Sequence, residues 1–105
     1  MPSIRKLDRR PGLEKRGSPT ALKQLRRLRR VDAAAILDAV DLHLRHEPDR
    51  PTRSRIKQLR GKQEATYRLR VGDYRVFYDV GEGVVTVVAV FHKRDTARFH
   101  REETP

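Results

Sequence analysis

Apolar and polar side chains alternate along two runs near the middle of the chain, Thr66–Val71 and Tyr74–Val80. A period of two is that of a β-strand, because successive side chains point to opposite faces of a sheet. Each run therefore predicts a strand with one apolar face, and the residues between the apolar ones are directed to a second face. The residues predicted on this second face are Arg68, Arg70, Arg75 and Phe77.

Glycine-containing turns separate these runs from each other and from a third. Gly72-Asp73 and Gly81-Glu82-Gly83 have the composition of hairpin turns. The run Val84–Phe91 that follows is almost wholly apolar, which is typical of a strand covered on both faces, so we expect it to be the central strand. Upstream, Arg55–Leu59 predicts a short edge strand.

Two helices are predicted before these strands. The first begins near Pro19, because Ser18 suits an N-cap and proline suits a first turn. Asp32 is expected to cap the second helix, which runs from Ala33 to about His46. The short link predicts an antiparallel hairpin, and its apolar stripe, at helical spacing, is expected to pack on the sheet. The stripe consists of Leu22, Leu25, Ile36, Leu37 and Val40.

The two ends of the chain predict little regular structure. Residues 1–17 are basic and form either one weak strand, near Leu13–Gly17, or an extended arm. Residues 95–105 form a polar tail. The chain has 105 residues and no internal repeat, so we expect a single domain over residues 1–105.

Composition narrows the class of partner. With 25 Lys and Arg against 14 Asp and Glu, the formal net charge is +11, which draws a chain toward nucleic acid, an anionic surface or an acidic protein. The absence of cysteine excludes disulfides and thiolate metal sites, and fits a reducing cytoplasm. No apolar run approaches the roughly 20 residues of a membrane span, and the basic start lacks the apolar stretch of a secretory signal.

Several blocks of the chain, together with the order strand, two helices and three strands, resemble the RelE/ParE superfamily of bacterial toxins from type II toxin–antitoxin systems. The resemblance covers about residues 18–100 and implies an α+β fold. That fold is a small twisted, mainly antiparallel sheet of three to five strands, with the N-terminal helical hairpin on one face. The blocks that carry the resemblance are Ala21–Leu25, Ile56–Gly61, Tyr67–Tyr78 and Val90–Arg94.

By this resemblance the chain is expected to be a toxin, and the leading hypothesis is a ribosome-dependent mRNA endonuclease that inhibits translation. Its partners are then mRNA, the ribosome and a cognate antitoxin, an acidic and partly disordered protein that covers the arginine face. Two alternatives stay open: a ParE-like inhibitor of DNA gyrase, and a non-catalytic basic nucleic-acid-binding module. The chain departs from the nuclease members at Phe99, where they often carry a tyrosine.

Cleavage of RNA by its 2′-hydroxyl requires a base, a cation at the crowded phosphorus and an acid for the leaving 5′ oxygen. The sequence has no H-E-x-x-H motif and no paired carboxylates at metal spacing, so we expect a mechanism without metal or cofactor that rests on positive charge. Arg75 is the first candidate for phosphate stabilisation, because a guanidinium has a fixed charge and a bidentate fork. By the resemblance, Arg68 and Arg70 are phosphate clamps.

Proton transfer needs a different kind of residue, because arginine hardly deprotonates. His92 or Lys93 is the candidate acid. The base is left unassigned, since neither Asp49 nor Glu64 matches the family pattern cleanly. The competing interpretation of the arginines is a solvated sheet face, with Arg75 paired to a neighbouring aspartate.

Further residues are candidates for contacts to nucleic acid. Phe77 and Phe99 are expected to stack on bases, with packing of Phe77 in the protein interior as an equal alternative. Lys57 and Arg60 are expected to contact the phosphate backbone. Arg94 is expected to replace the basic residue that RelE-type members carry at this place.

Overall fold

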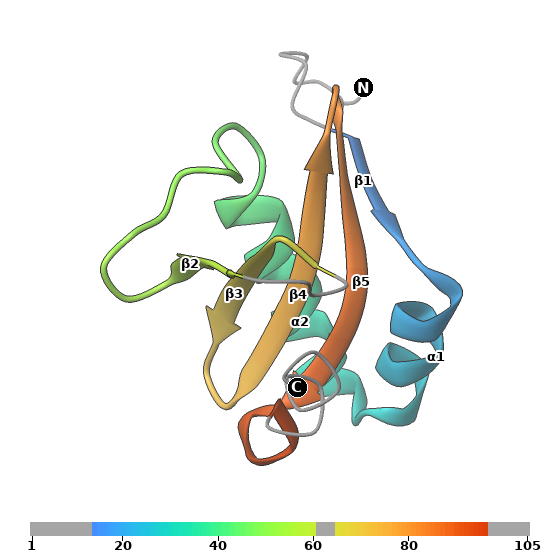
Figure 1. Cartoon of the computed structure of the whole chain (residues 1–105). Coiled ribbons are helices and arrows are strands. Elements are labelled where there is room, and N and C mark those ends of the chain that lie inside the picture. The colour runs from blue at the N-terminus through green and yellow to red at the C-terminus, as the bar shows by residue number, and fades with distance from the viewer. Residues whose placement is uncertain (1–13, 61–64, 97–105) are drawn as a thin grey trace.

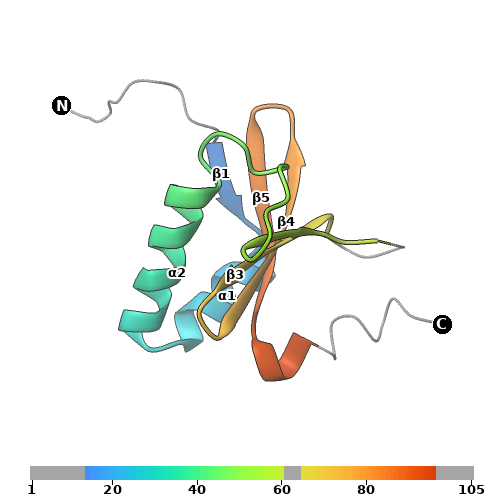
Figure 2. The ribbon, with the colours of Figure 1, turned by 90° about the vertical axis from the view of Figure 1, so that its left-hand side faces the viewer.

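The computed structural model describes residues 14–60 and 65–96 of the chain. Two helices cover one face of a five-stranded twisted sheet (Figures 1 and 2), which confirms the predicted α+β fold. The strand order is β1-β5-β4-β3-β2, with a parallel β1–β5 pair and antiparallel pairs elsewhere. The elements are β1 (Glu14–Gly17), α1 (Pro19–Arg27), α2 (Arg30–His43), β2 (Ile56–Gln58), β3 (Tyr67–Val71), β4 (Tyr74–Gly81), β5 (Val84–His92) and the 3-10 helix η1 (Lys93–Asp95).

Ser18 joins the first strand to the first helix and to the sheet. Its hydroxyl accepts a hydrogen bond from the N–H of Ala21 (3.0 Å) and donates one to the carbonyl of Val88 (2.7 Å), so Ser18 caps α1 as predicted. Further along, the N–H of Val90 donates to the side-chain oxygen of Gln24 (2.6 Å). The first helix therefore satisfies the edge of β5 beyond the point where β1 stops pairing with it.

The predicted start of the second helix is wrong. Helix α2 begins at Arg30, with Arg29 as its N-cap, and ends at His43, earlier than predicted. Asp32 lies in the first turn, where its carboxylate accepts hydrogen bonds from Arg29 and from the hydroxyl of Tyr74, both at 3.2 Å. The acid thus stabilises the helix from within its first turn, where a negative charge is favourable, and ties α2 to β4.

The most apolar strand is also not the middle one. Strand β4 lies at the centre of the sheet, and β5 lies beside it, between β4 and β1. The weak first strand and the short strand β2 occupy the two edges, as the sequence allowed and predicted. Both hairpins turn where glycine was expected: Gly72 and Gly83 have φ angles of 57° and 73°, which favour glycine.

The main core lies between the helices and the sheet. Ile36 of α2 is 1% exposed, and Leu69 and Val76 of the two central strands are fully buried. Tyr78 is buried beside them, and its hydroxyl donates a hydrogen bond to the carbonyl of Pro48. This bond fastens the segment that follows α2 to the centre of the sheet.

A smaller core lies on the other face of the sheet, around Phe77. This side chain is fully buried with Ala65 and Ala89, and Leu59 packs against the cluster. Its ring meets the edge of the Phe91 ring at a centroid distance of 6.0 Å. The prediction that Phe77 stacks on a nucleic-acid base is therefore wrong, because neighbouring segments already cover the ring.

The apolar stripe of the hairpin is only partly buried. Ile36 and Val40 belong to the core and Leu25 packs against it, as predicted. Leu22 and Leu37, in contrast, are 44% and 54% exposed, so the prediction that they pack on the sheet is wrong. Both line an apolar groove of about 190 Å³ between the two helices and the first and fifth strands. The hairpin thus leaves part of its stripe open to solvent.

Replacing Ile36 by alanine is expected to lower the free energy of unfolding by about 2–5 kcal/mol, because the side chain is buried and a cavity remains. Leu37→Ala, on the same helix, is expected to cost less than about 1 kcal/mol because the leucine is already half exposed. Urea unfolding measures both losses. Equal losses for the two variants would contradict this packing of α2.

Candidate nucleic-acid interface

Four cations share the sheet face that points away from the helices. Leu69 is buried on the helix side, so Arg68 and Arg70, which flank it in β3, point to the other side. The strand register places Arg70 opposite Arg75 of β4, and Arg68 opposite Lys57 of β2. Residues directly opposite each other on antiparallel strands lie on the same face. These four residues (Lys57, Arg68, Arg70 and Arg75) form what we call the cationic face.

The arginines of the cationic face have little compensating charge. Within residues 14–60 and 65–96, none of the three guanidinium groups forms an ion pair with a carboxylate. Burial lowers the pKa of Arg68, and the nearby guanidinium groups of Arg75 and Arg70 lower it further. Burial and Arg70 also lower the pKa of Arg75, while Asp73 opposes this. All three remain charged at neutral pH, so the fold holds like charges close together.

Two of these arginines are fixed in different ways. The Nη1 atom of Arg75 donates hydrogen bonds to the carbonyls of Gly72 and Tyr74, both at 2.9 Å, which holds the side chain against the β3–β4 turn. The Nε atom of Arg68 is buried and has no hydrogen-bond partner among the described residues. A buried donor without an acceptor is costly, so Arg68 is prepared for an external anion.

Lys93 lies at the same turn as Arg75. Its backbone N–H donates to the carbonyl of Asp73 (2.7 Å), and its Nζ atom is 3.5 Å from the Asp73 carboxylate. The other neighbouring acid, Asp79, accepts hydrogen bonds from the backbone and hydroxyl of Thr66. The pairing of Arg75 with either aspartate, which the sequence left open, is therefore not formed as an ion pair among the described residues.

His92 lies on the helix side of the sheet. It is directly opposite Tyr74 in the strand register, and the two rings meet edge to face at a centroid distance of 5.4 Å. Its Nδ1 atom accepts a hydrogen bond from the N–H of Arg94 (3.2 Å), so a neutral ring carries its proton on Nε2. The guanidinium of Arg94 is also close enough to lower the pKa of Tyr74, against the dominant effect of burial, which raises it. His92 and Arg94 are therefore separated from Arg75 by the sheet.

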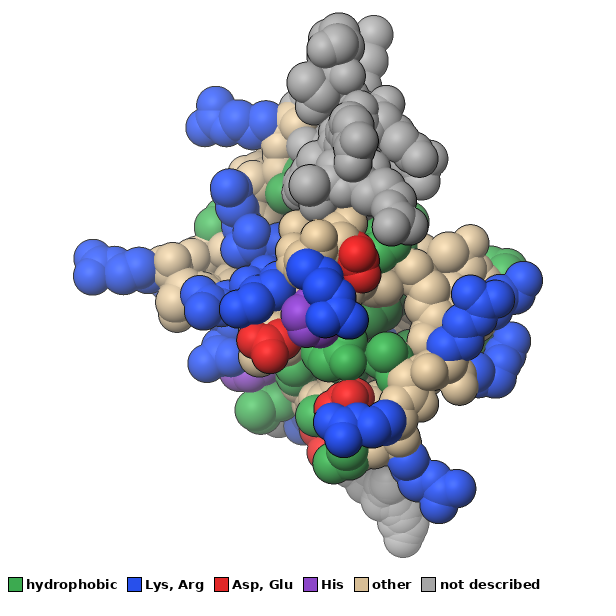
Figure 3. All heavy atoms as spheres, turned by 90° about the horizontal axis from the view of Figure 1, so that it is seen from below, with side chains coloured by type: hydrophobic (Ala, Val, Ile, Leu, Met, Phe, Trp, Pro, Cys, Tyr) green, Lys and Arg blue, Asp and Glu red, His purple; other side chains and the backbone are tan. Residues whose placement is uncertain are grey.

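Seen from the lower end of the molecule, Lys and Arg side chains spread over a surface that also carries a histidine and a few acids (Figure 3). Of the remaining predicted contacts, Arg60 lies with Lys57 and Arg68 around a pocket beside β2. The structure thus brings these three predicted cations together. Phe99 lies outside the described residues.

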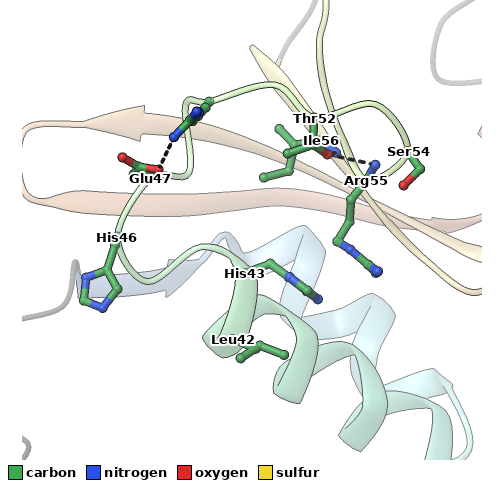
Figure 4. A pocket seen from close by; sticks show the side chains of 9 residues that line it. Leu42, His43, His46, Glu47, Thr52, Ser54, Arg55 and Ile56 are labelled. Carbon is green, nitrogen blue, oxygen red and sulfur yellow. Dashed lines mark hydrogen bonds and ion pairs between the residues drawn. The ribbon is translucent and has the colours of Figure 1, made fainter.

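A second pocket, of about 390 Å³, lies on the helix side, between the end of α2 and the loop before β2 (Figure 4). In it the side chain of Arg55 extends from the loop toward His43, and burial together with Arg55 lowers the pKa of this histidine. Glu47 is paired with Arg50 at 3.1 Å. Among the described residues, no group of three or more His, Cys, Asp or Glu could hold a metal ion, and no helix is long and apolar enough to cross a membrane.

One cation near the cationic face was not singled out from the sequence. Arg53 lines the pocket beside β2, although it lies in a loop without periodicity. The only signal was the basic, proline-containing composition of residues 49–55.

Comparison with known families gives a match over most of the chain. Residues 16–97 match the sequence model of a family described as "ParE toxin of type II toxin-antitoxin system, parDE". No curated protein matches the chain. The matched range includes both helices and the four strands β2 to β5.

Solved structures with a similar fold come from toxin–antitoxin complexes. A chain of the complex RelBE2 from Mycobacterium tuberculosis is 28% identical, with a TM-score of 0.67, covering 77% of this chain and 98% of that one. A chain of the RelE–RelB complex from Pyrococcus horikoshii OT3 is 22% identical, with a TM-score of 0.62 and coverages of 78% and 96%. A chain of the RelB–RelE complex from Methanococcus jannaschii is 20% identical, with a TM-score of 0.52 and coverages of 79% and 95%. The last two support the fold alone.

Removing one charge from the cationic face is expected to stabilise the free protein slightly. Arg70 is exposed, so Arg70→Gln removes repulsion without leaving a cavity and should raise the melting temperature by about 1–3 °C at low ionic strength. The gain should vanish near 1 M salt, where charges are screened within about 3 Å. Thermal melts at both salt concentrations measure this, with Lys23→Gln on exposed α1 as the control. A lower melting temperature for Arg70→Gln at low salt would contradict the repulsion.

Proposed function

Since this chain belongs to the family of ParE toxins of type II toxin–antitoxin systems, within the RelE/ParE superfamily, it is a toxin of such a system, and we propose that it acts by cleaving mRNA on the ribosome. The observation that carries this proposal is the cationic face. Its arginines repel one another and lack carboxylate partners among the described residues. A polyanion that lies across the face supplies the missing negative charge, and RNA presents one phosphate per nucleotide.

The arrangement suits the attack of a 2′-hydroxyl on the neighbouring phosphate. Arg75, anchored at the β3–β4 turn, binds the phosphate oxygens as negative charge builds up at phosphorus. Arg68 and Arg70 bind the same or the adjoining phosphate as clamps. When the bond from phosphorus to the 5′ oxygen breaks, this oxygen takes a proton from an acid.

Lys93 is the better placed of the two candidate acids. It shares Asp73 and the β3–β4 turn with Arg75, whereas His92 lies beside Tyr74 on the helix side. An ammonium group at this turn both donates a proton and adds positive charge near the scissile phosphate. We therefore assign the acid to Lys93, with His92 as the residue to test against it.

The description of the matching family favours a second candidate function, because it names ParE rather than RelE. A ParE-like toxin inhibits DNA gyrase by binding and needs no proton donor. The two functions differ in what the cationic face must do: a nuclease requires Arg75 and Lys93 for a chemical step, and a gyrase inhibitor requires them at most for contact.

The solved relatives are toxin–antitoxin complexes, which supports an antitoxin as the protein partner. We assign its docking surface to the apolar groove that Leu22 and Leu37 leave open between the helices and the sheet. An antitoxin helix with an apolar stripe would bury these leucines. An acidic segment of the same antitoxin would cover the cationic face and replace RNA there.

Arg75→Ala is expected to slow cleavage by about 10²–10³-fold, because the group that binds the phosphorane is lost. Lys93→Met is expected to slow it by about 10²–10⁴-fold, while His92→Gln should have less than about a tenfold effect. Single-turnover cleavage of mRNA on programmed ribosomes measures all three rates, with thermal melts to confirm folding.

A large loss for His92→Gln combined with a small loss for Lys93→Met would move the acid to His92. Cleavage at the wild-type rate by a folded Arg75→Ala protein would remove Arg75 from the site. If the wild-type toxin cleaves no mRNA under any ribosomal condition and inhibits gyrase instead, the ribonuclease proposal is wrong.

Leu37→Ser should weaken antitoxin binding by at least about tenfold, because the exposed leucine loses its contact in the groove while the fold is kept. Leu42→Ser is the control, since Leu42 is 70% exposed on the same helix and does not line the groove. Calorimetric titration with the antitoxin measures both affinities. Equal effects of the two substitutions would place the antitoxin elsewhere.

A further inference from the structure

A pocket of about 330 Å³ adjoins the cationic face at the edge of the sheet, between the loop of residues 51–55 and strands β2 and β3. Five Lys and Arg residues line it, and no Asp or Glu is among its lining residues. The polar groups of Ser54 and Gln58 complete the lining. A concave site with this composition selects for anions. The five cations are Arg53, Arg55, Lys57, Arg60 and Arg68.

The loop that forms one wall is held by specific hydrogen bonds. The hydroxyl of Thr52 accepts from the N–H groups of Arg55 (3.0 Å) and Ile56 (2.9 Å), and Figure 4 shows this turn from its other side. The N–H of Thr52 donates to the carbonyl of Ile56 (2.9 Å), and the N–H of Arg70 donates to the carbonyl of Arg55 (2.8 Å). The loop is therefore closed on itself and tied to β3, so its cations have a fixed origin.

Arg68 belongs both to this pocket and to the cationic face. Its Nε donor is buried without a partner among the described residues, and Lys57 lies directly opposite it in the strand register. An anion in the pocket would meet this donor and the Lys57 ammonium together. The pocket and the face are thus one continuous positive surface that turns the edge of the sheet.

We propose that this pocket is a second phosphate subsite, which holds a backbone phosphate of the RNA strand next to the one on the cationic face. The inference rests on the proposed function and extends it from the reacting phosphate to a flanking one. Arg53 and Lys57 bind the flanking phosphate, and Arg68 bridges the two subsites. Neither Arg53 nor Lys57 touches the reacting atoms, so the subsite contributes to binding rather than to the chemical step.

Phosphate is a better occupant than a carboxylate side chain for two reasons. The lining cations come from the loop and from both strands, so they surround an anion from several directions, and a phosphodiester offers oxygens in more directions than a carboxylate does. The neighbouring cationic face also repeats the same preference at the next position, which matches the regular spacing of charges along a nucleic-acid strand.

The experiment measures binding of a short single-stranded RNA with 2′-O-methyl groups, which cannot be cleaved, to the full chain at several salt concentrations. Arg53 is exposed and forms no hydrogen bond or ion pair within the described residues, so Arg53→Gln preserves the fold. Its matched control is Arg26→Gln, which removes the same charge from the exposed side of α1. Fluorescence anisotropy gives the affinities.

Arg53→Gln is expected to weaken binding by about three- to tenfold at low salt, and to reduce the slope of log affinity against log salt by about 0.7, the value for one phosphate contact on a single strand. Arg53→Lys should restore most of the affinity, and Arg26→Gln should leave the slope unchanged. In cleavage on ribosomes, Arg53→Gln should raise KM with kcat nearly constant. Single-stranded DNA of the same sequence should show the same loss, because the contact is to phosphate.

If Arg53→Gln and Arg26→Gln behave alike while the wild type cleaves mRNA, the subsite is refuted and the proposed nuclease stands. If Arg53→Gln has the expected effect on binding but the wild type never cleaves, the subsite stands and the nuclease falls. Absence of any measurable binding of RNA by the wild type overturns both.

Discussion

The burial of Leu69 determines where the charges of β3 point. Leu69 is fully buried on the helix side, opposite Ile56 and Val76 on its two neighbouring strands. Side chains alternate along a strand, so Arg68 and Arg70 must lie on the other face. A register slip of one residue would place both guanidinium groups in the core, which is far more costly than the slip could recover. The apolar core thereby selects the position of the cations.

This arrangement has a cost in the free protein that a bound polyanion removes. Arg68, Arg70 and Arg75 repel one another, as the lowered pKa of Arg68 and Arg75 indicates. The small core around Phe77 covers a neighbouring part of the same face and stabilises the sheet against this repulsion. Function and stability therefore divide one sheet face between them: the aromatic residue became structural, and the cations were left to bind.

Local rules explain what the sequence predicted well, and long-range cover explains what it missed. Periods of two and of 3.6, the serine cap and the turn glycines act within a few residues, so the strands, α1 and both hairpins were predictable. The exposure of Phe77 or Leu37 depends on segments far away in the chain, which no local pattern encodes. The side on which His92 lies depends on strand pairing, and β4 and β5 shift register between Phe77 and Tyr78. Arg53 sits in a loop, where periodicity gives no signal.

The separation of the two candidate surfaces constrains how an antitoxin neutralises this toxin. The apolar groove beside Leu37 lies on the helix side of the sheet, and the cationic face lies on the other side. A partner that filled only the groove would leave Arg68, Arg70 and Arg75 accessible to RNA. A partner that covered only the cations would depend on charge and would weaken as salt screens it. Tight and salt-resistant inhibition requires one chain that does both, which means an antitoxin long enough to pass around an edge of the sheet. Strand β2 is the shortest edge and carries the basic pocket, so an acidic segment that takes this route would meet cations along its whole path.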